Sequence, residues 1–476
     1  MMDSRLTARA LTALIGSWRM REPAYEALAD AIRLLCLDGR IAPRTALPAE
    51  RELAARLGVS RTTIAAAYRS LRGSGHIESV RGSGSVTLPI GRRDLGRAAA
   101  EDGMIDLQQA SPSAWPGLAA VYAELAAEAA AVVARPGYEV LGRPGLREAI
   151  ARRYEERGLP TDPAQIMVTT GAQSAITLVA SVLVSRGDAV LVETPTYPHA
   201  ADAFARVGGR LVAVPVTVGG GWDLDRAEHA IQRSRPRALY LMPDFHNPTG
   251  ESMAVESRRR IAELARSVGA VVIVDETTAE LSIERRIAPP PFATVGGENT
   301  ITLGSLGKTV WGGLRIGWIR ADVDTIRRLA TARPAMDLGT PEFEQAISER
   351  LMPLMPEILQ QRSQLLREGR DALITALAQE LPEWSVPHAS GGVALWIGIG
   401  AARSSALTLA ARRRGLLLSA GPRFSVGGGH ERHIRVPFTA PPALLSHAAT
   451  LLGQAWRDVA HDRFGSGEQQ PLDAVV

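Results

Sequence analysis

Apolar residues recur at helical spacing in the first part of the chain. The pattern predicts a first helix over residues 25–37, with apolar positions at Leu28, Ile32, Leu35 and Cys36. A second short helix is predicted over residues 50–57, and Gly58 ends it because a missing Cβ permits a left-handed turn. Ser60 then caps a third helix over residues 61–71.

Two short strands around a glycine-rich tip are predicted next, over residues 75–86. The elements together indicate a winged helix-turn-helix, an α+β module that binds DNA. The second helix of the helix-turn-helix, residues 61–71, begins with Arg61, Thr62 and Thr63. In this arrangement short polar and guanidinium groups reach base edges in the major groove. The wing would carry Arg81 to the DNA backbone. A small helical protein-interaction domain is the alternative.

Strand-like apolar runs alternate with helical stretches in the rest of the chain. Continuous Val, Ile and Leu runs indicate strands that are buried on both faces. The runs are residues 189–192, 211–214, 238–242, 271–274 and 300–303. The expected fold class is therefore α/β, with a mostly parallel sheet covered by helices, and ligands should gather at the carboxyl ends of its strands.

Charge differs between these two parts of the chain. Residues 1–97 contain 16 arginines and 9 acidic residues, a net charge of +7, and the whole chain carries +4, which leaves −3 for the remainder. A basic N-terminal fifth is typical of a nucleic-acid-binding module joined to a neutral or acidic domain. A solvated basic face would give the same count.

Composition limits where in the cell the protein is expected and whether disulfides or metal sites are expected. No run of about 18 apolar residues occurs, and residues 1–21 lack the apolar stretch and cleavage site of a signal peptide, so a cytoplasmic protein without membrane contact is expected. Cys36 is the single cysteine, and its place in an apolar helical pattern predicts a buried thiol. One cysteine excludes disulfides and cysteine-ligated metals within the chain, and no metal is expected.

Lysine is almost absent from the chain. Of the 54 basic residues counted as Lys plus Arg, only Lys308 is a lysine. A surface cation could equally be arginine, so a lysine that survives is a candidate for a task that a guanidinium cannot perform, namely that of a nucleophilic amine. Survival by chance is the alternative.

Residues at the predicted strand ends suit one particular ligand. Residues 169–174 precede a helix expected to begin at Ala175, whose free N–H groups suit a phosphate. Tyr197 could cover one face of a flat ring, and Asn247 could donate to a phenolate oxygen.

Two further strand ends complete this set. Asp275 places a carboxylate at a buried strand tip, where it needs a positive partner such as a protonated pyridine nitrogen, and Lys308 adds an amine for an aldehyde. Each residue alone is an ordinary loop or turn residue. Together they indicate a pyridoxal 5′-phosphate pocket.

The N-terminal module resembles the GntR family of regulators over residues 25–88. The matching segments are residues 47–54, 58–63, 67–68 and 82–84. The resemblance implies DNA contacts by Arg51, Ser60, Arg61, Thr62, Thr63, Arg81 and Gly82. The sequence departs from the family at Ala49, where a helix-capping serine is common, and loss of that cap costs about 1 kcal/mol.

The large domain resembles the fold-type I aminotransferases over residues 105–460. The resemblance implies that pyridoxal 5′-phosphate is covalently linked through Lys308, paired with Asp275 at its pyridine nitrogen, stacked on by Tyr197 and met at its phenolic oxygen by Asn247. The implied phosphate ligands are Gly171, Ala172, Gln173, Ser305 and Arg315.

The same resemblance implies a homodimer and an acidic ligand. Tyr138 matches the tyrosine that reaches the neighbouring subunit's phosphate, and Arg435 matches the arginine that grips a substrate carboxylate. Two positions depart from the family. Thr278 stands where a tyrosine usually binds the phenolic oxygen, and Gly307 replaces the serine that commonly precedes the lysine, so efficient transamination is not expected.

The order of modules resembles the MocR subfamily of GntR regulators. The expected domains are an N-terminal arm and winged helix-turn-helix (1–88), a linker (89–104), an aminotransferase-like domain with a smaller C-terminal α+β subdomain (105–464) and a flexible tail (465–476). The resemblance implies a regulator of operator DNA in which the cofactor, or its adduct with a small amine or amino acid, acts as the effector. The alternatives are a working aminotransferase with a DNA-binding appendage and a scaffold that has lost its cofactor.

Overall fold

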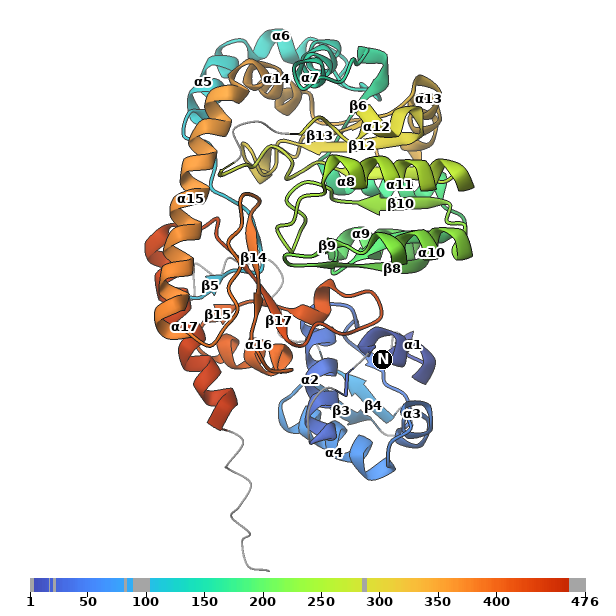
Figure 1. Cartoon of the computed structure of the whole chain (residues 1–476), viewed down its shortest axis with the longest axis vertical. Helices are drawn as coiled ribbons and strands as arrows, with labels where there is room; N and C mark the ends of the chain where they lie inside the picture. Colours follow the sequence, from blue (N-terminus) through green and yellow to red (C-terminus); the bar gives the residue numbers. More distant parts are fainter. Residues whose placement is uncertain are drawn as a thin grey trace, which may run out of the picture.

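Figure 1 shows the computed structural model of the chain, which describes residues 4–16, 18–19, 23–80, 84–88, 103–284 and 289–461. The predicted wing residues Arg81 and Gly82, most of the predicted linker and the predicted tail lie outside these residues. A small N-terminal unit, here called the head, lies beside the C-terminal part of a much larger domain (Figure 1).

The head is a helical unit with a small sheet. Its helices are α1 (Ala8–Ile15), α2 (Ala24–Leu37), α3 (Glu50–Leu57) and α4 (Arg61–Gly73). Its strands, in sheet order, are β1 (Ser4–Arg5), β2 (Thr45–Ala46), β4 (Gly84–Thr87) and β3 (Ile77–Val80). The three predicted helices and the two wing strands are confirmed, and α1 is an additional helix. Leu28, Leu53, Ile64 and Leu71 are fully buried where α2, α3 and α4 meet.

The large domain is built on an eight-stranded sheet. In sheet order the strands are β6 (Ile166–Thr169), β13 (Gly317–Arg320), β12 (Thr300–Ser305), β11 (Val271–Asp275), β10 (Ala238–Leu241), β7 (Ala189–Thr194), β8 (Arg210–Thr217) and β9 (Gly221–Trp222). The five strands predicted from apolar runs pair in parallel with one another. The antiparallel pairings are those of β13 with β12 and β6, and of β9 with β8. The α/β fold class is confirmed.

Helices cover both faces of this sheet (Figure 1). One face packs on α8 (Ala172–Leu183), α9 (Pro198–Arg206) and α13 (Val323–Ala332). The other packs on α10 (Leu224–Ser234), α11 (Val255–Val268) and α12 (Ala293–Gly296). Coverage of both faces explains why the strands are apolar throughout rather than alternating. Beyond the β6 edge lie α5 (Leu118–Ala127), α6 (Ala129–Val133), α7 (Pro144–Glu156) and α14 (Glu342–Leu351).

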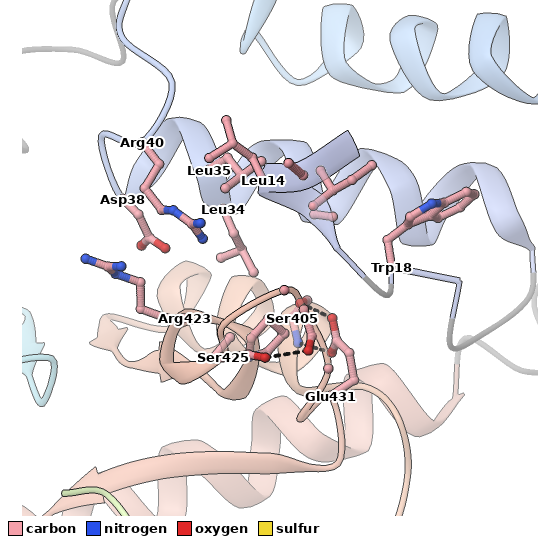
Figure 2. Close-up of a pocket in the computed structure, with 18 residues that line it drawn as sticks. Leu14, Trp18, Leu34, Leu35, Asp38, Arg40, Ser405, Arg423, Ser425 and Glu431 are labelled. Atoms are coloured by element: carbon pink, nitrogen blue, oxygen red, sulfur yellow. Dashed lines mark hydrogen bonds between the residues drawn. The ribbon is translucent and has the colours of Figure 1, made fainter. Parts of the chain in front are cut away.

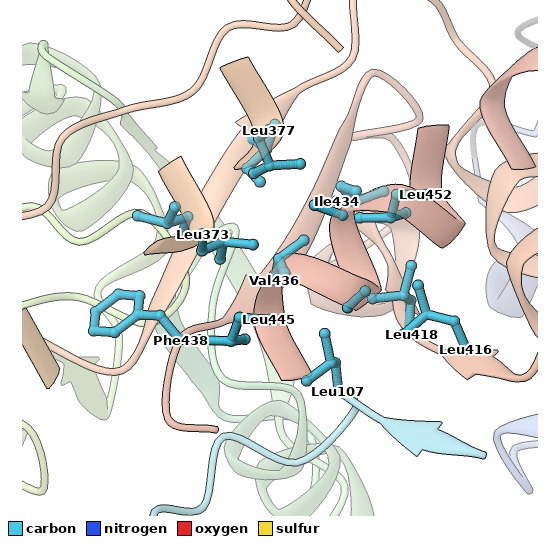
Figure 3. Close-up of a cluster of buried hydrophobic side chains, with 14 of the residues drawn as sticks. Leu107, Leu373, Leu377, Leu416, Leu418, Ile434, Val436, Phe438, Leu445 and Leu452 are labelled. Atoms are coloured by element: carbon cyan, nitrogen blue, oxygen red, sulfur yellow. The ribbon is translucent and has the colours of Figure 1, made fainter. Parts of the chain in front are cut away.

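The C-terminal subdomain is α+β, as predicted. Its three-stranded sheet has the order β14 (Ala394–Gly398), β17 (His433–Pro437) and β16 (Ser419–Ala420). The helices are α15 (Met355–Glu380), α16 (Ser404–Arg413) and α17 (Pro442–His461), and β15 (Leu416–Leu417) pairs in parallel with β5 (Ile105–Asp106). Figure 3 shows their shared core, in which Leu373 and Leu377 of α15 face Val436 of β17 and Leu445 of α17.

The head packs against this subdomain through α2 and α16. Within the described residues, each helix is too short or too polar to cross a bilayer.

Candidate functional site

A cavity of about 550 Å³ lies at the carboxyl ends of the parallel strands, between the sheet and the C-terminal subdomain. The sequence-predicted residues that line it are Ala172, Gln173, Tyr197, Asn247, Asp275, Ser305, Lys308, Arg315 and Arg435. The structure thus brings together residues that are separated by up to 263 positions in the sequence. Two predicted residues are not in this lining: Gly171 lies just behind it, and Tyr138 lies on the protein surface.

Lys308 follows β12 and is almost enclosed by the cavity walls. Burial, followed by the positive charges of Arg435 and Arg315, lowers the pKa of its amine to about 8, and Asp275 opposes the shift. A lysine with this pKa has a far larger neutral fraction near pH 7 than an ordinary lysine, roughly a tenth of the molecules. It can therefore act as a nucleophile towards a carbonyl group.

Asp275 is the last residue of β11 and is buried. Its Oδ2 accepts a hydrogen bond of 2.6 Å from the Tyr240 hydroxyl, and its Oδ1 accepts one of 2.9 Å from the backbone N–H of Thr277. Burial raises the pKa of this carboxyl, and the two donors oppose that rise. The carboxylate is held in place for a positively charged partner, such as a protonated ring nitrogen.

Sequence reasoning missed Tyr240, although the strand pattern contained a signal for it. Tyr240 pairs with Ile273 across β10 and β11, and Asp275 lies two residues further along β11 on the same face. A tyrosine on the strand next to an isolated buried carboxylate is a natural hydrogen-bond donor to it.

The start of α8 forms an anion-binding cradle. Helix α8 begins at Ala172 rather than at the predicted Ala175, because Gly171 is its N-cap with a φ of 82°. A Cβ at Gly171 would lie 2.5 Å from Nη2 of Arg315, so the guanidinium packs directly on the glycine. Free N–H groups, the positive end of the helix dipole and Arg315 converge here, an arrangement that suits a phosphate.

The wall of the cavity that the C-terminal subdomain forms carries a buried cation without a carboxylate partner among the described residues. Arg435 is buried, and its Nη2 donates to the backbone oxygen of Gln108. Within the described residues its Nε has no hydrogen-bond partner, and none of the ion pairs joins its guanidinium to a carboxylate. Its guanidinium lies 4.9 Å from the centre of the Phe424 ring. Burial lowers its pKa to about 10. Because a buried charge without a partner is costly, this wall is suited to an anionic ligand group.

A further orphaned group, a hydrogen-bond acceptor, indicates that the pocket suits a polar ligand. Among the described residues, the side-chain oxygen of Asn247 is also buried without a hydrogen-bond partner. Tyr197 caps α9 at the cavity wall, and burial raises the pKa of its hydroxyl to about 12, so it remains a neutral ring. The residues therefore fit pyridoxal phosphate: an amine with a lowered pKa, a buried carboxylate, a ring cover and a phosphate cradle.

The two departures from the aminotransferase pattern have structural roles. The Thr278 hydroxyl donates to the backbone oxygen of Asp244 at 2.9 Å, so its hydrogen is turned away from the cavity. The Gly307 backbone N–H donates to Oγ of Ser305 at 3.0 Å, and that same Oγ donates to the oxygen of Ile316. The hydroxyl groups of Thr278 and Ser305 are thus each donated to a backbone oxygen.

Tyr138 lies on an apolar surface at the far end of the domain. Its side chain is 73% exposed, and Val133, Met336 and Leu338 are also exposed. A Cβ at Gly339 would lie 3.2 Å from the backbone oxygen of Glu139, so the segments that carry Leu338 and Tyr138 touch. Exposed apolar residues that cluster in this way are typical of a surface that a partner covers.

The proposed DNA-reading residues lie on the outside of the head. Arg51, Ser60, Arg61 and Thr62 are exposed, and Thr63 is half-buried. Oγ of Ser60 accepts from the backbone N–H of Thr63 at 3.1 Å and also bonds the Thr62 hydroxyl at 2.7 Å. The cap therefore fixes the hydroxyl groups of the first turn of α4. Arg61 also lies 3.6 Å from Glu50, an ion pair that sequence reasoning did not predict.

Comparison with known proteins matches both halves of this architecture. Residues 121–452 match the family "Aminotransferase class I and II". The chain belongs to this family. Residues 24–86 match the family "Bacterial regulatory proteins, gntR family", which establishes a GntR-type DNA-binding domain joined to the aminotransferase domain. Aminotransferases of this family depend on pyridoxal phosphate, so the expected cofactor is confirmed at the level of the family.

Individual relatives of this aminotransferase family member fall into two groups. A 2-aminoadipate transaminase from Thermus thermophilus is 32% identical over 342 residues, which cover 70% of this chain and 86% of the relative. An uncharacterized HTH-type transcriptional regulator, YdfD, from Bacillus subtilis is 26% identical over 452 residues, 87% of this chain and 92% of the relative.

A solved structure agrees with the first group. The crystal structure of LysN, an α-aminoadipate aminotransferase from Thermus thermophilus complexed with N-(5′-phosphopyridoxyl)-L-leucine, is 28% identical. It superposes with a TM-score of 0.69 over 77% of this chain and 96% of that one. The full-length match to a regulator, with family matches in both halves, confirms the MocR-type architecture.

Proposed function

We propose that this DNA-binding regulator senses a small amine or amino acid through pyridoxal phosphate held in its aminotransferase domain. The observation that carries the proposal is the complete pocket around the sole lysine, joined in one chain to a GntR-type head. The Thr278 hydroxyl, which is committed to a backbone oxygen, and the absence of a hydroxyl at Gly307 support sensing rather than rapid turnover.

Each pocket residue has a distinct proposed role. Lys308 supplies the amine for the cofactor aldehyde, Asp275 holds a proton on the ring nitrogen, Tyr197 covers the ring and Asn247 donates to its phenolic oxygen. The phosphate is held by Gly171, Ala172, Gln173, Ser305 and Arg315. When bound, the cofactor supplies an aldehyde that reversibly captures amines. Arg435 binds the carboxylate of the captured molecule bidentately.

We further propose a homodimer formed at the apolar surface around Tyr138, which would bring Tyr138 to the partner's phosphate cradle. DNA contacts are assigned to Arg51, Ser60, Arg61, Thr62 and Thr63, together with Arg81 and Gly82 of the wing. Because the target is operator DNA, the protein is assigned to the bacterial cytoplasm.

DNA footprinting with and without pyridoxal phosphate, each in the presence of a panel of amino acids and amines, tests this function. The expected result is protection of one operator whose extent or affinity changes with the cofactor and one class of amine. Identical footprints and affinities in all conditions would contradict sensing, while DNA binding itself would stand.

A working aminotransferase is the second candidate, favoured by the lowered pKa of Lys308 and by the transaminase relatives. Steady-state transamination with amino acids and a keto acid separates the two candidates. A specificity constant in the enzyme range of about 10⁴ to 10⁸ M⁻¹s⁻¹ would support the aminotransferase, whereas slow or absent turnover is expected here.

A further inference from the structure

One residue lies between the cofactor pocket and the surface on which the head packs. A second cavity, here called the junction cavity, lies between the head and the C-terminal subdomain (Figure 2). From the head it is lined mainly by Leu14, Trp18, Leu34, Leu35, Asp38 and Arg40. The opposite wall is the 3₁₀ helix η8 (Gly421–Phe424) and the loop that follows it. Arg423 of η8 lines both the junction cavity and the pocket that contains Lys308.

On the pocket side, Arg423 belongs to a group of charges. Its Nη2 donates to Oδ2 of Asp202 at 2.9 Å, beside His199 of the pocket wall. Arg423 and Arg435 are near enough that the charge of Arg423 adds to burial in lowering the pKa of Arg435. A carboxylate that binds Arg435 is therefore also attracted to Arg423.

On the head side, the end of α2 is followed by one negative and one positive side chain, Asp38 and Arg40. In Figure 2 the carboxyl group of Asp38 lies between the guanidinium groups of Arg40 and Arg423. Packing around Asp38 raises the pKa of its carboxyl, and Arg423 opposes this rise more strongly than Arg40 does. Arg423 therefore favours the ionised Asp38 across the junction cavity. Within the described residues the carboxylate at salt-bridge distance from Arg423 is that of Asp202, so the attraction between Arg423 and Asp38 acts at longer range.

Hydrogen bonds hold the backbone on both sides of Arg423, so the side chain is the part that can move when a ligand binds. The oxygen of Phe424 accepts from the N–H of Thr196 at 2.9 Å, next to the ring-covering Tyr197. At the other end of the loop, Glu431 accepts from the N–H of Ser405 in α16 at 3.0 Å. A ligand would redirect the guanidinium without unfolding the loop.

A close backbone contact completes the junction. A Cβ at Gly16, the C-cap of α1, would lie 2.3 Å from the oxygen of Gly427 and 2.4 Å from Cα of Gly428. The head can lie in this position only because residue 16 has no side chain. The first turn of α4 stays exposed, so docking fixes the orientation of the DNA-reading surface without covering it.

From this placement we infer that Arg423 couples the pocket to the head: a ligand carboxylate competes with Asp202 for Arg423 and draws the guanidinium into the pocket, its attraction to Asp38 across the junction cavity is lost, and the head is released from the subdomain. The inference rests on the proposed sensing function and adds the route by which the pocket acts on DNA binding. Since a ligand shifts an equilibrium only through unequal affinity for its two states, carboxylate binding must be tighter in the released state.

Energy transfer between two dyes measures the head position directly. One dye is placed on the head at Arg56→Cys and the other on α15 at Gln364→Cys, both exposed positions. Cys36 stays unlabelled because burial raises the pKa of its thiol to about 12. Labelled chains are diluted tenfold with unlabelled protein, so that both dyes of a labelled dimer belong to one chain.

The probe ligand is N-(5′-phosphopyridoxyl)-L-leucine, and its control is the conjugate of isopentylamine, which lacks only the carboxylate. The leucine conjugate should lower the transfer efficiency, and the control should leave it high. Arg423→Gln should give low efficiency without ligand and lose the response to the probe, whereas Arg432→Gln, in the same loop but outside both cavities, should behave like wild type. Equal responses of Arg423→Gln and wild type would overturn the inference and leave sensing intact.

Two further variants test the same inference if Arg423→Gln fails to fold. Asp38→Asn removes the partner on the head side and should release the head without touching the pocket; combined with Arg423→Gln it should add nothing further. Gly16→Ala should also release the head, whereas Gly75→Ala should not, because Gly75 also has a positive φ (72°, compared with 52° at Gly16) but open space around it. Undisturbed docking in Asp38→Asn and Gly16→Ala would overturn the inference. High efficiency that vanishes on dilution would also overturn it, since the head would then lie on the partner subunit.

If wild type shows no response to the probe and its operator affinity is also independent of cofactor and amines, both the inference and the proposed function fail.

Discussion

Lys308 combines a rare residue type with an environment that changes its chemistry. Elsewhere in the chain positive charge is carried by arginine, and the one lysine lies where burial and two guanidinium groups hold its pKa near 8. The sequence predicted that Lys308 is special because of its rarity. The size and cause of the pKa shift depend on Arg435 and Arg315, whose approach to Lys308 only the folded chain determines.

Lys308→Ala should abolish the visible absorption band of the protein purified with pyridoxal phosphate, because the chain has no other lysine to replace it. Absorption spectroscopy and borohydride trapping followed by peptide mass analysis check this. Arg327→Ala, a change at an exposed cation, is the control and should keep the band. Trapping of the cofactor elsewhere in wild type would contradict the assignment.

The rate at which cofactor-free protein captures pyridoxal phosphate should depend on pH with a midpoint near the Lys308 pKa of about 8. The neutral amine is the reactive form, so the rate rises as pH increases through this pKa. At pH 7 the neutral fraction should exceed that of an ordinary lysine by roughly two orders of magnitude.

Arg435→Gln supplies the matched comparison for this profile. Removal of a like charge should raise the pKa of Lys308 and move the midpoint to higher pH. Stopped-flow absorbance measures both proteins, and an unmoved midpoint would contradict the electrostatic explanation.

At the scale of elements, the type of each predicted helix and strand follows from its hydrophobic pattern. Which strand pairs with which does not follow from that pattern. The parallel strands and the helices of the head were predictable because their periodicity is strong. The antiparallel β13, inserted between β6 and β12, was not predicted, since apolar pattern alone does not determine strand order. The short α1 was missed although Thr7, Leu11 and Ile15 carry a cap and a helical spacing.

The Ser60 cap gives a quantitative test at this scale. Ser60→Ala removes the acceptor for the N–H of Thr63 at the start of α4 and should lower the unfolding free energy of the head by about 1 kcal/mol. Ser79→Ala, at an exposed position of β3, should change it by less than about 0.5 kcal/mol. Urea denaturation followed by circular dichroism measures both; equal values would mean that the cap contributes nothing.

At the scale of the whole molecule, the proposed dimer would carry two heads, so its operator should contain two half-sites. The residues that line the pocket were largely predictable, because most of them follow a recognisable strand end, whereas Arg435 lies within β17. The contact between head and subdomain was not, because Gly16, Asp38 and Arg423 are ordinary residues until the fold brings them together.

Arg51→Ala should weaken binding to all DNA sequences alike and reduce the slope of log affinity against log salt concentration by about 1, and Arg81→Ala should do the same. Arg61→Ala should instead cost about 1 to 3 kcal/mol on the operator and relax its sequence preference. Fluorescence anisotropy titrations over a range of salt concentrations measure these effects, with Arg56→Ala as the exposed control on α3. An unchanged slope for Arg51→Ala would remove it from the DNA interface.

The confinement of lysine to the pocket also has a consequence for regulation by modification. Acetylation acts on amines, and guanidinium groups do not form Schiff bases with aldehydes. The arginine-only head therefore keeps its positive charge in the presence of acetyl donors or excess free cofactor. Covalent chemistry at side-chain amines is restricted to Lys308. Reagents that modify lysine amines therefore change the pocket and leave the side chains of the DNA-binding surface unmodified.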